Sequence, residues 1–307
     1  LLLFNTVGNI DYIWRILFAI GAIPAILVVY GRRKLPETPK YSLRVRGDAR
    51  SAKKDWEAVS GRSDVKLSSE DMEVARMKWY NILTDRRFII SLIGTAGAWF
   101  MMDWAFYGNS IMSHQMLSVI VPSAVGGLAA IKLTTIYTAM IFGIAAFPAY
   151  WIATFTVDKI GIKRIQVLGF SAIAVAYLVL GVFHFLMSSS YALDFLIIYG
   201  LSYFFIEFGP NVTTFIYGPE MYPTPIRGLG SGISSAGGKM GAFVGTFLNV
   251  IVDAVFGEST LFLILAAISI VGSILTAVSL PETKGKSLED ISGEKRYLVH
   301  ASPGGRK

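Results

Sequence analysis

Three charged side chains lie deep inside long apolar stretches of this sequence: Asp103, Glu207 and Lys239. Each stands roughly ten to sixteen residues from the start of its stretch, near the middle of a helix that crosses a bilayer. Charged groups are costly at that depth and normally face one another or a polar cavity. They therefore predict either a structural ion pair or a site that handles a charged substrate and protons.

Two polar aromatic residues flank Asp103 at helical spacing. Trp99, Asp103 and Tyr107 follow one another at intervals of four residues, which places them on one face of a helix over about two turns. The face carries an indole N–H, a carboxyl and a phenol. An aromatic stripe alone usually indicates packing, but the central carboxyl favours a binding site.

Glu207 and Asn211 are also four residues apart, in "SYFFIEFGPNVTTF". Pro210 lies between them and cannot donate a backbone hydrogen bond, so the helix is interrupted there. Interrupted helices at membrane depth occur where they line cavities. Lys239 lies in "GLGSGISSAGGKMGAFVGTF", whose small residues predict close helix packing.

These groups together suit an oxyanion. Lys239 supplies positive charge, and Trp99, Tyr107 and Asn211 supply neutral donors. The charged form of a carboxyl in a poorly hydrated pocket beside an anion is disfavoured, so Asp103 can take up a proton and donate it to the anion. Dihydrogen phosphate carries protons that an ionised Asp103 can accept, whereas sulfate carries none at neutral pH. The residues therefore favour phosphate, bound together with protons.

The composition indicates what must position these residues. The chain has 307 residues, of which 53% are hydrophobic and 16% charged, with a mean hydropathy of +0.55 and no cysteine. Soluble domains carry about 25% charged residues. An all-α polytopic membrane protein follows, without disulfides or thiol-bound metal.

Seven apolar runs are long enough to cross a bilayer as helices. The run 115–131 is excluded, because it is short and broken by Pro122, Gly126 and Gly127. The polar segment 31–87 contains short helical patterns such as 68–79. The seven predicted spans lie near residues 13–30, 88–112, 133–156, 165–187, 193–217, 229–252 and 260–280.

The basic residues predict the orientation. With 31–87 placed in the cytoplasm, the cytoplasmic segments hold most of the 28 lysines and arginines: 15 in 31–87, 3 in 157–164, 1 in 218–228 and 6 in 281–307. The outer connections hold only Lys132. This asymmetry follows the positive-inside rule and places the C-terminal tail in the cytoplasm.

The site residues lie in motifs that resemble the phosphate:proton symporters of the major facilitator superfamily, most closely the fungal high-affinity phosphate transporters. The specific matches are Trp99, Asp103 and Tyr107 in W-x3-D-x3-Y, Asn211 in "FGPN" and Lys239 in "GGKMGA". "DKIGIKR", "GPEMYPTPIRG" and "PETKGKSLED" resemble motifs that sugar transporters share.

The resemblance implies a bundle of this superfamily, with seven transmembrane helices of an expected twelve, in the plasma membrane. Residues 1–30 are then the end of the N-terminal bundle with its sixth helix, and 31–87 the cytoplasmic loop between bundles. Residues 88–280 are the C-terminal six-helix bundle, and 281–307 the cytoplasmic tail. Helices one to five of the N-terminal bundle are expected as a partner that completes the phosphate site.

Further residues have expected roles at the cytoplasmic ends of the spans. Asp158, Arg164, Glu220 and Arg227, with Lys163 nearby, are candidates for ion pairs that close the inner side, or they only set topology. Glu207 is either a proton-coupling group, together with Asp103, or the partner of Lys239.

Several classes of function are not expected. The three histidines show no metal-ligand spacing, and no glycine-rich nucleotide-binding loop occurs. We expect no enzyme activity, cofactor, metal or nucleic acid. The prediction is a proton-coupled importer of inorganic phosphate that works by alternating access in a lipid bilayer. The alternatives are a sugar or organic-solute porter, and a non-transporting nutrient receptor that signals through 31–87.

Overall fold

The computed structural model describes residues 10–61, 73–75 and 78–300, and it divides into two compact units. One unit comprises Leu1–Val74 with Val299–Lys307, and the other comprises Ala75–Leu298. The second unit holds the predicted site residues.

The first unit contains α2 (Ile10–Arg32), α3 (Pro39–Arg44) and α4 (Ala49–Ser60). Asp48 begins α4, because its side chain accepts backbone N–H groups of the first turn, and these bonds lower the pKa of its carboxyl. The helices α3 and α4 pack together through a 2.7 Å hydrogen bond from Ser42 to Asp55.

The helical pattern predicted for residues 68–79 is wrong at Glu73–Ala75, which form the strand β1. This strand pairs with β2 (Leu298–His300) in a two-stranded sheet. Both strands are short and contain valine, which favours strands. Pairing with a segment far away in the sequence outweighs the local helical pattern at Glu73–Ala75. Residues 68–72 and 76–77 lie outside the described residues.

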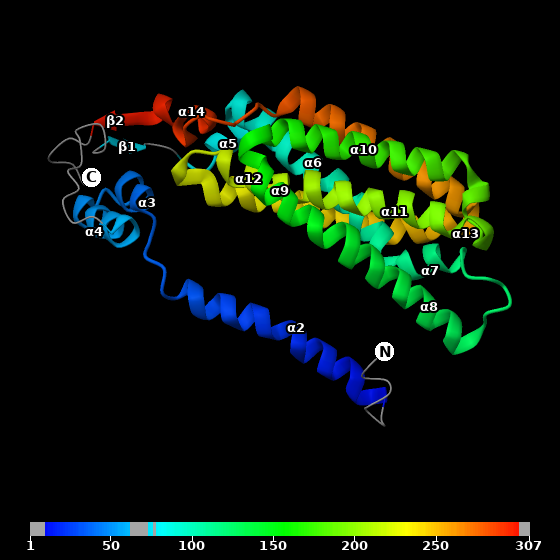
Figure 1. Cartoon of the computed structure of the whole chain (residues 1–307). Helices are drawn as coiled ribbons and strands as arrows, with labels where there is room; N and C mark the ends of the chain where they lie inside the picture. Colours follow the sequence, from blue (N-terminus) through cyan, green and yellow to red (C-terminus); the bar gives the residue numbers. More distant parts are fainter. Residues whose placement is uncertain (1–9, 62–72, 76–77, 301–307) are drawn as a thin grey trace. The chain divides into compact units, whose positions relative to one another are not determined.

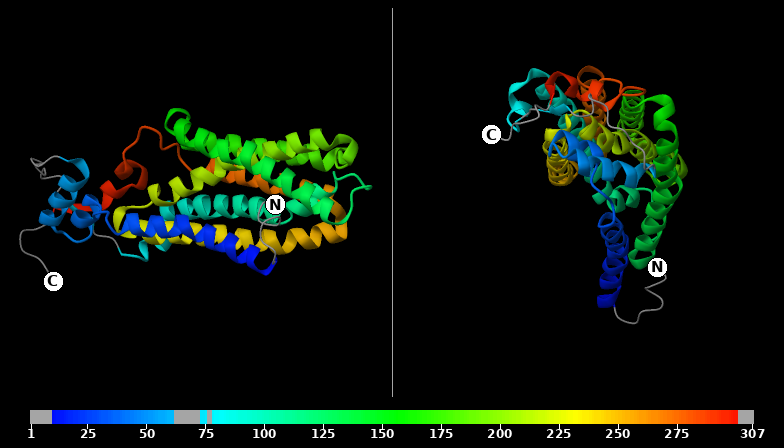
Figure 2. Two further views of the ribbon diagram at one scale, coloured as in Figure 1. Left: turned by 60° about the horizontal axis from the view of Figure 1, so that its bottom comes forward. Right: turned by 90° about the vertical axis from the view of Figure 1, so that its left-hand side faces the viewer.

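The second unit is a bundle of long helices that run lengthwise side by side (Figures 1 and 2). Its helices, including short 3-10 and π segments marked η, are α5 (Asn81–Thr84), α6 (Arg86–Ile111), α7 (Ser113–Ser118), α8 (Gly127–Met140), η2 (Ile141–Ala146), α9 (Phe147–Ile160), α10 (Ile162–Val182), η3 (His184–Leu186), η4 (Ser189–Tyr191), α11 (Ala192–Ile206), η5 (Glu207–Asn211), α12 (Val212–Glu220), η6 (Thr224–Ile226), α13 (Arg227–Ser279), α14 (Leu288–Ser292) and η7 (Glu294–Tyr297).

Six helices among the described residues are long and apolar enough to cross a membrane: Tyr12–Arg32, Arg86–Ile111, Gly127–Ile160, Ile162–Val182, Ser189–Glu220 and Thr224–Ser279. They confirm the prediction of an all-α, multi-pass membrane protein. The run 115–131 contains only the end of α7, a connection and the start of α8, as its length predicts.

The last of these helices accounts for two of the seven predicted spans. It covers 56 residues, and a bilayer needs only about 20. Inside α13, Gly257 has φ 79° and ψ 168°, a conformation that residues with a side chain rarely adopt. The chain turns at this glycine, which separates two limbs, 227–256 and 258–279.

Both limbs of α13 pack against α6, in opposite directions. Along the first limb, Gly237 lies beside Ala96 and Gly245 beside Trp104, so both helices run the same way. The end of the second limb instead meets the start of α6, where a Cβ on Gly94 would lie 2.9 Å from Ser279. The two limbs are therefore antiparallel, as two successive membrane crossings require.

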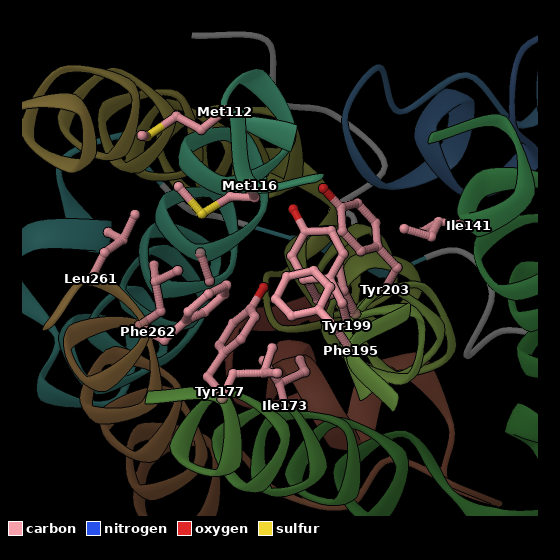
Figure 3. Close-up of a cluster of buried hydrophobic side chains, with 14 of the residues drawn as sticks. Met112, Met116, Ile141, Ile173, Tyr177, Phe195, Tyr199, Tyr203, Leu261 and Phe262 are labelled. Atoms are coloured by element: carbon pink, nitrogen blue, oxygen red, sulfur yellow. The ribbon is translucent and has the colours of Figure 1, made fainter. Parts of the chain in front are cut away.

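The core of this unit contains a cluster of buried aromatic rings between α10, α11 and α13 (Figure 3). Phe195 stacks on Tyr199 with ring centroids 5.3 Å apart, and Tyr177 lies 5.7 Å from Phe262. These large side chains fill the space between the helices and fix the positions of α10 and α11 relative to α13.

Candidate substrate and proton site

The structure brings Asp103, Tyr107 and Lys239 together. The ammonium of Lys239 lies 3.3 Å from Oδ2 of Asp103 and 3.2 Å from the hydroxyl of Tyr107. It also lies 4.5 Å from the centroid of the Tyr107 ring, which allows a cation–π interaction. The carboxylate, ammonium and phenol can therefore contact one small anion.

Burial differs sharply within this ion pair. The side chain of Asp103 is 2% exposed, whereas that of Lys239 is 65% exposed. The carboxylate lies inside the bundle, and the lysine reaches it from the open surface. An approaching anion would meet Lys239 and Tyr107 before it meets Asp103.

Glycines bring Lys239 close to α6. A Cβ on Gly241 would lie 2.1 Å from the carbonyl oxygen of Phe100, so the two backbones are in direct contact there. A helix with larger residues at this contact could not approach so closely. The small residues of the sixth predicted span thus set the short distance between Lys239 and Asp103.

Trp99 is the buried end of the aromatic face on α6. It is 5% exposed, and its ring lies 4.8 Å from that of Phe215 on α12. On the other side, a Cβ on Gly238 would lie 2.4 Å from the indole. The indole is also among the groups that interact with the Asp103 carboxyl. Trp99 is therefore held in a narrow slot between α12 and α13, next to the acid.

Glu207 and Asn211 form a second polar pair, on the π-helical segment η5. The amide of Asn211 donates to Oε2 of Glu207 over 2.6 Å, and Glu207 is 9% exposed. Lys239 has Asp103 as its carboxylate partner, so the structure does not support the alternative in which Glu207 pairs with the lysine.

Pro210 and Gly209 explain the irregular helix at this pair. Pro210 has no backbone N–H, and Gly209 has φ −100° and ψ −108°, outside the helical region. A Cβ on Gly169 of α10 would lie 2.6 Å from Cα of Gly209, so the helices touch at their backbones. Glu207 also borders a shallow hollow of about 460 Å³, shared with Phe142, Gly143, Ala146, Phe147 and Tyr150.

The residues predicted to close the inner side lie at one end of the bundle. The guanidinium of Arg227 attracts the carboxylate of Glu220, whereas the carboxylate of Asp158 repels it. Arg227 forms an ion pair with Glu294, at 3.9 Å. No interaction of Arg164 with these residues is seen in the described part of the chain. The role of this group as a gate stays a prediction.

Sequence reasoning missed two acids at this end. Glu294 is 1% exposed and accepts hydrogen bonds from the backbone and hydroxyl of Thr224, at 3.2 Å and 2.9 Å. Glu282 accepts the backbone N–H of Ile162 at the start of α10, over 3.0 Å. The "PETKG" motif around Glu282 could have identified this acid, whereas no local pattern in the sequence identifies Glu294.

The segment after α13 is fastened to the start of α6. The hydroxyl of Tyr297 donates to Asp85, and Arg87 donates to the carbonyl of Ile291 over 2.6 Å. The bond from Tyr297, with the backbone N–H of Arg87, lowers the pKa of Asp85. Burial and the neighbouring carboxylate raise the pKa of Tyr297 to about 12.

A buried polar network was also missed. Asn109 on α6 donates to the hydroxyl of Tyr177 over 2.9 Å and accepts from that of Tyr199 over 2.8 Å. All three side chains are fully buried. Their polar groups are separated widely in the sequence, so no local pattern links them.

Comparisons with known proteins agree with this architecture. Residues 1–294 match the family described as sugar (and other) transporters, and the chain belongs to that family. A solved major facilitator superfamily structure, the proton:xylose symporter XylE, superposes with a TM-score of 0.72 at 18% identity, covering 94% of this chain and 61% of that one. The described bundle therefore has the major facilitator fold.

Curated relatives are more similar in sequence. A probable inorganic phosphate transporter 1-6 of Arabidopsis thaliana is 36% identical, covering 94% of this chain and 58% of its own length. A low affinity inorganic phosphate transporter 4 of Petunia hybrida is 35% identical, covering 94% and 57%. The chain thus spans somewhat over half the length of these relatives. Both are plant proteins, and the expected likeness to fungal transporters stays a prediction.

Proposed function

We propose that this chain is the larger part of a proton-coupled importer of inorganic phosphate. The observation that carries the proposal is the contact of Lys239 with both Asp103 and Tyr107, which joins a cation, an acid and a neutral donor at one point. Relatives covering most of the chain are named inorganic phosphate transporters. Trp99 borders the same site, and Asn211 completes it when phosphate is bound.

Asp103 couples phosphate to protons in this proposal. An anion that binds Lys239 competes with Asp103 for the ammonium, and an unpaired buried carboxylate is costly. Protonation of Asp103 removes that cost and creates a donor to the anion. Entry of one monovalent phosphate with more than one proton carries net positive charge, so the membrane potential drives it, at about 2.3 kcal/mol per charge per 100 mV.

A second bundle is required for transport by alternating access. Lys239, Phe243 and Phe247 lie four residues apart on the first limb of α13, and all three side chains are exposed. This row is where we expect the N-terminal bundle, with helices one to five, to pack and to complete the phosphate site. The plasma membrane, with 31–87 and the C-terminal tail in the cytoplasm, is the proposed location.

The test is Asp103→Asn in the full-length protein, reconstituted in vesicles. The amide keeps the shape of the side chain but can neither carry charge nor exchange a proton, so we expect proton-driven phosphate accumulation to be abolished. Asp194→Asn, on the exposed start of α11, is the matched control and should transport normally. Normal accumulation by Asp103→Asn would refute the proposal.

A sugar or organic-solute porter is the second candidate, favoured by the family match and by the fold shared with a xylose symporter. Competition separates the two. Uptake of labelled phosphate should resist excess glucose, glycerophosphate and sulfate, and unlabelled phosphate should abolish it. Strong inhibition by glucose with transport of labelled glucose would favour the sugar porter.

A further inference from the structure

Three glycines on the first limb of α13 stand four residues apart and contact the backbone of α6. A Cβ on any of them would press against a carbonyl oxygen of α6; the glycines are Gly237, Gly241 and Gly245, and their partners are Ala96, Phe100 and Trp104. Every residue carries the same carbonyl, so these contacts hold the helices close but would be kept after a shift of one turn, about 5.4 Å. The glycines therefore do not specify the register of the two helices.

A polar contact one turn after Gly245 does distinguish the register. Asn249 is 1% exposed, and its Oδ1 accepts the indole N–H of Trp104 over 3.0 Å. The side chain of Asn249 lies against Gly108 of α6, since a Cβ on this glycine would collide with the amide nitrogen. A shift by one turn would break the bond and put Trp104 or Met112 in the place of Gly108.

Stability alone does not explain an asparagine at this position. The Nδ2 of Asn249 is buried and has no hydrogen-bond partner among the described residues. Leucine has a similar size and would fill the site without an unpaired polar atom, which is costly in an apolar interior. In coiled coils, a single buried asparagine fixes the register of the helices at a cost in stability. Asn249 is buried between two parallel helices in the same way.

The register matters because Lys239 contacts two residues of α6 that lie one turn apart. Its ammonium is 3.3 Å from Oδ2 of Asp103 and 3.2 Å from the hydroxyl of Tyr107. A shift of α13 by one turn in either direction would carry the ammonium away from one of them. Trp104 directly follows Asp103, so its bond to Asn249 acts on the same part of α6.

We propose that the bond between Trp104 and Asn249 fixes the register of α6 against α13, and that both are positioning residues for the phosphate site. They act through the backbones of the two helices and keep Lys239 within reach of both Asp103 and Tyr107. This inference rests on the proposed function, in which phosphate binds at that contact.

The test is a double-mutant cycle in the full-length protein reconstituted in vesicles, with Trp104→Phe, Asn249→Leu and their combination. Each single variant should raise the KM for phosphate about threefold, the effect of an average hydrogen bond between membrane helices. The maximal rate should persist, because saturating phosphate favours the assembled site. The combined variant should be no worse than either single one, since the same bond is lost only once.

Spin labels measure the register directly. The chain has no cysteine, so Ile111→Cys on α6 and Val255→Cys on α13 can each carry one label in a full-length protein otherwise free of cysteine. Both side chains are exposed. In Asn249→Leu, the distribution of distances between the labels should broaden or shift by up to one helical turn, about 5.4 Å.

Ser269→Ala is the matched control, because it removes another buried polar group from α13, one that bonds within its own helix. It should leave the KM and the label distances unchanged. Additive KM effects in the cycle overturn the proposal, and so does a wild-type KM or an unchanged label distance in Asn249→Leu. If the wild type carries no phosphate, the proposed function fails, while the label distances still decide whether the bond sets the register.

Discussion

The pair Asp103–Lys239 combines a nearly buried acid with a mostly exposed base. Burial makes the acid dependent on its partner, because removing one member of a buried pair leaves an uncompensated charge. Its exposure places the lysine on the face where we expect the N-terminal bundle to pack and to complete the site. The contact between Asp103 and Lys239 can therefore stabilise the site without substrate. It can break when a substrate that carries its own proton binds the lysine.

The slot around Trp99 gives a prediction at this scale. In Gly238→Ala, the new methyl group would lie 2.4 Å from the indole and displace it. Overpacking of this kind costs about 1–3 kcal/mol, and the shift of Trp99 should also lower phosphate uptake. Thermal unfolding of the purified full-length protein and uptake in vesicles measure the two effects.

Gly200→Ala on α11 is the control for this variant, since a Cβ there would meet only the methyl group of Ala145, at an ordinary contact distance of 3.9 Å. It should leave uptake unchanged and slightly raise the unfolding temperature, because alanine favours helix over glycine. Equal behaviour of the two variants would show that Trp99 does not need its present position.

At the scale of elements, the short helices after α13 act as a clasp on the bundle. The ring of Tyr297 lies 6.1 Å from that of Phe88, and its hydroxyl is bonded to Asp85, the residue that caps α6. Arg87 holds the end of α14 through the carbonyls of Asp290 and Ile291. The clasp joins segments about two hundred residues apart and stabilises the start of the helix that carries Asp103.

The clasp should depend on pH in a defined direction. The pKa of Asp85 is lowered in the folded state, so its contribution is complete above the unfolded value of about 4 and is lost as pH falls through the folded value. The pKa of Tyr297 is raised to about 12, so its contribution is complete below about 10 and is lost as pH rises through 12.

Tyr297→Phe should lower the free energy of unfolding at pH 7 by up to about 1 kcal/mol, because the bond is partly exposed to water. The difference from the wild type should shrink below pH 4. Denaturation in detergent across this pH range measures it, with Tyr12→Phe, an exposed tyrosine, as the control. A difference that is constant down to pH 2 would contradict the assigned bond.

At the scale of the whole molecule, the chain has a strong asymmetry of positive charge. Of its 28 lysines and arginines, 15 lie in 31–87 and only Lys132 lies in the connections predicted to be outside. The turn at Gly257 divides α13 into two crossings, which gives the seven crossings predicted. Successive connections then alternate between the two sides of the membrane. Together they predict that 31–87 and the C-terminal tail are cytoplasmic.

The absence of cysteine from the chain makes this orientation easy to test. Single cysteines at Ser60 and Ser123, both exposed, should react differently with a membrane-impermeant maleimide in intact cells. We expect labelling of Ser123→Cys from outside and of Ser60→Cys only after permeabilisation, in a full-length protein otherwise free of cysteine. Labelling of Ser60→Cys in intact cells would show that the predicted orientation is inverted.

The sequence by itself determined the class of protein and which polar residues share one face of a helix. Apolar runs of bilayer length require helices, because the backbone must satisfy its own hydrogen bonds in lipid. The spacing of Trp99, Asp103 and Tyr107 placed them on one face of α6, since that face depends only on helical periodicity. The free-energy cost of placing a charge at membrane depth identified Asp103, Glu207 and Lys239 as candidate functional residues from the sequence alone.

Only the tertiary structure decided which of these groups meet. Asp103 and Lys239 are separated by 136 residues, and the sequence also allowed Glu207 as the partner of the lysine. The close glycine contact between α6 and α13 brings Lys239 beside Asp103. The network of Asn109, Tyr177 and Tyr199 and the clasp of Tyr297 on Asp85 likewise join distant segments. Periodicity fixes the face of one helix, whereas pairing between helices depends on how their surfaces pack.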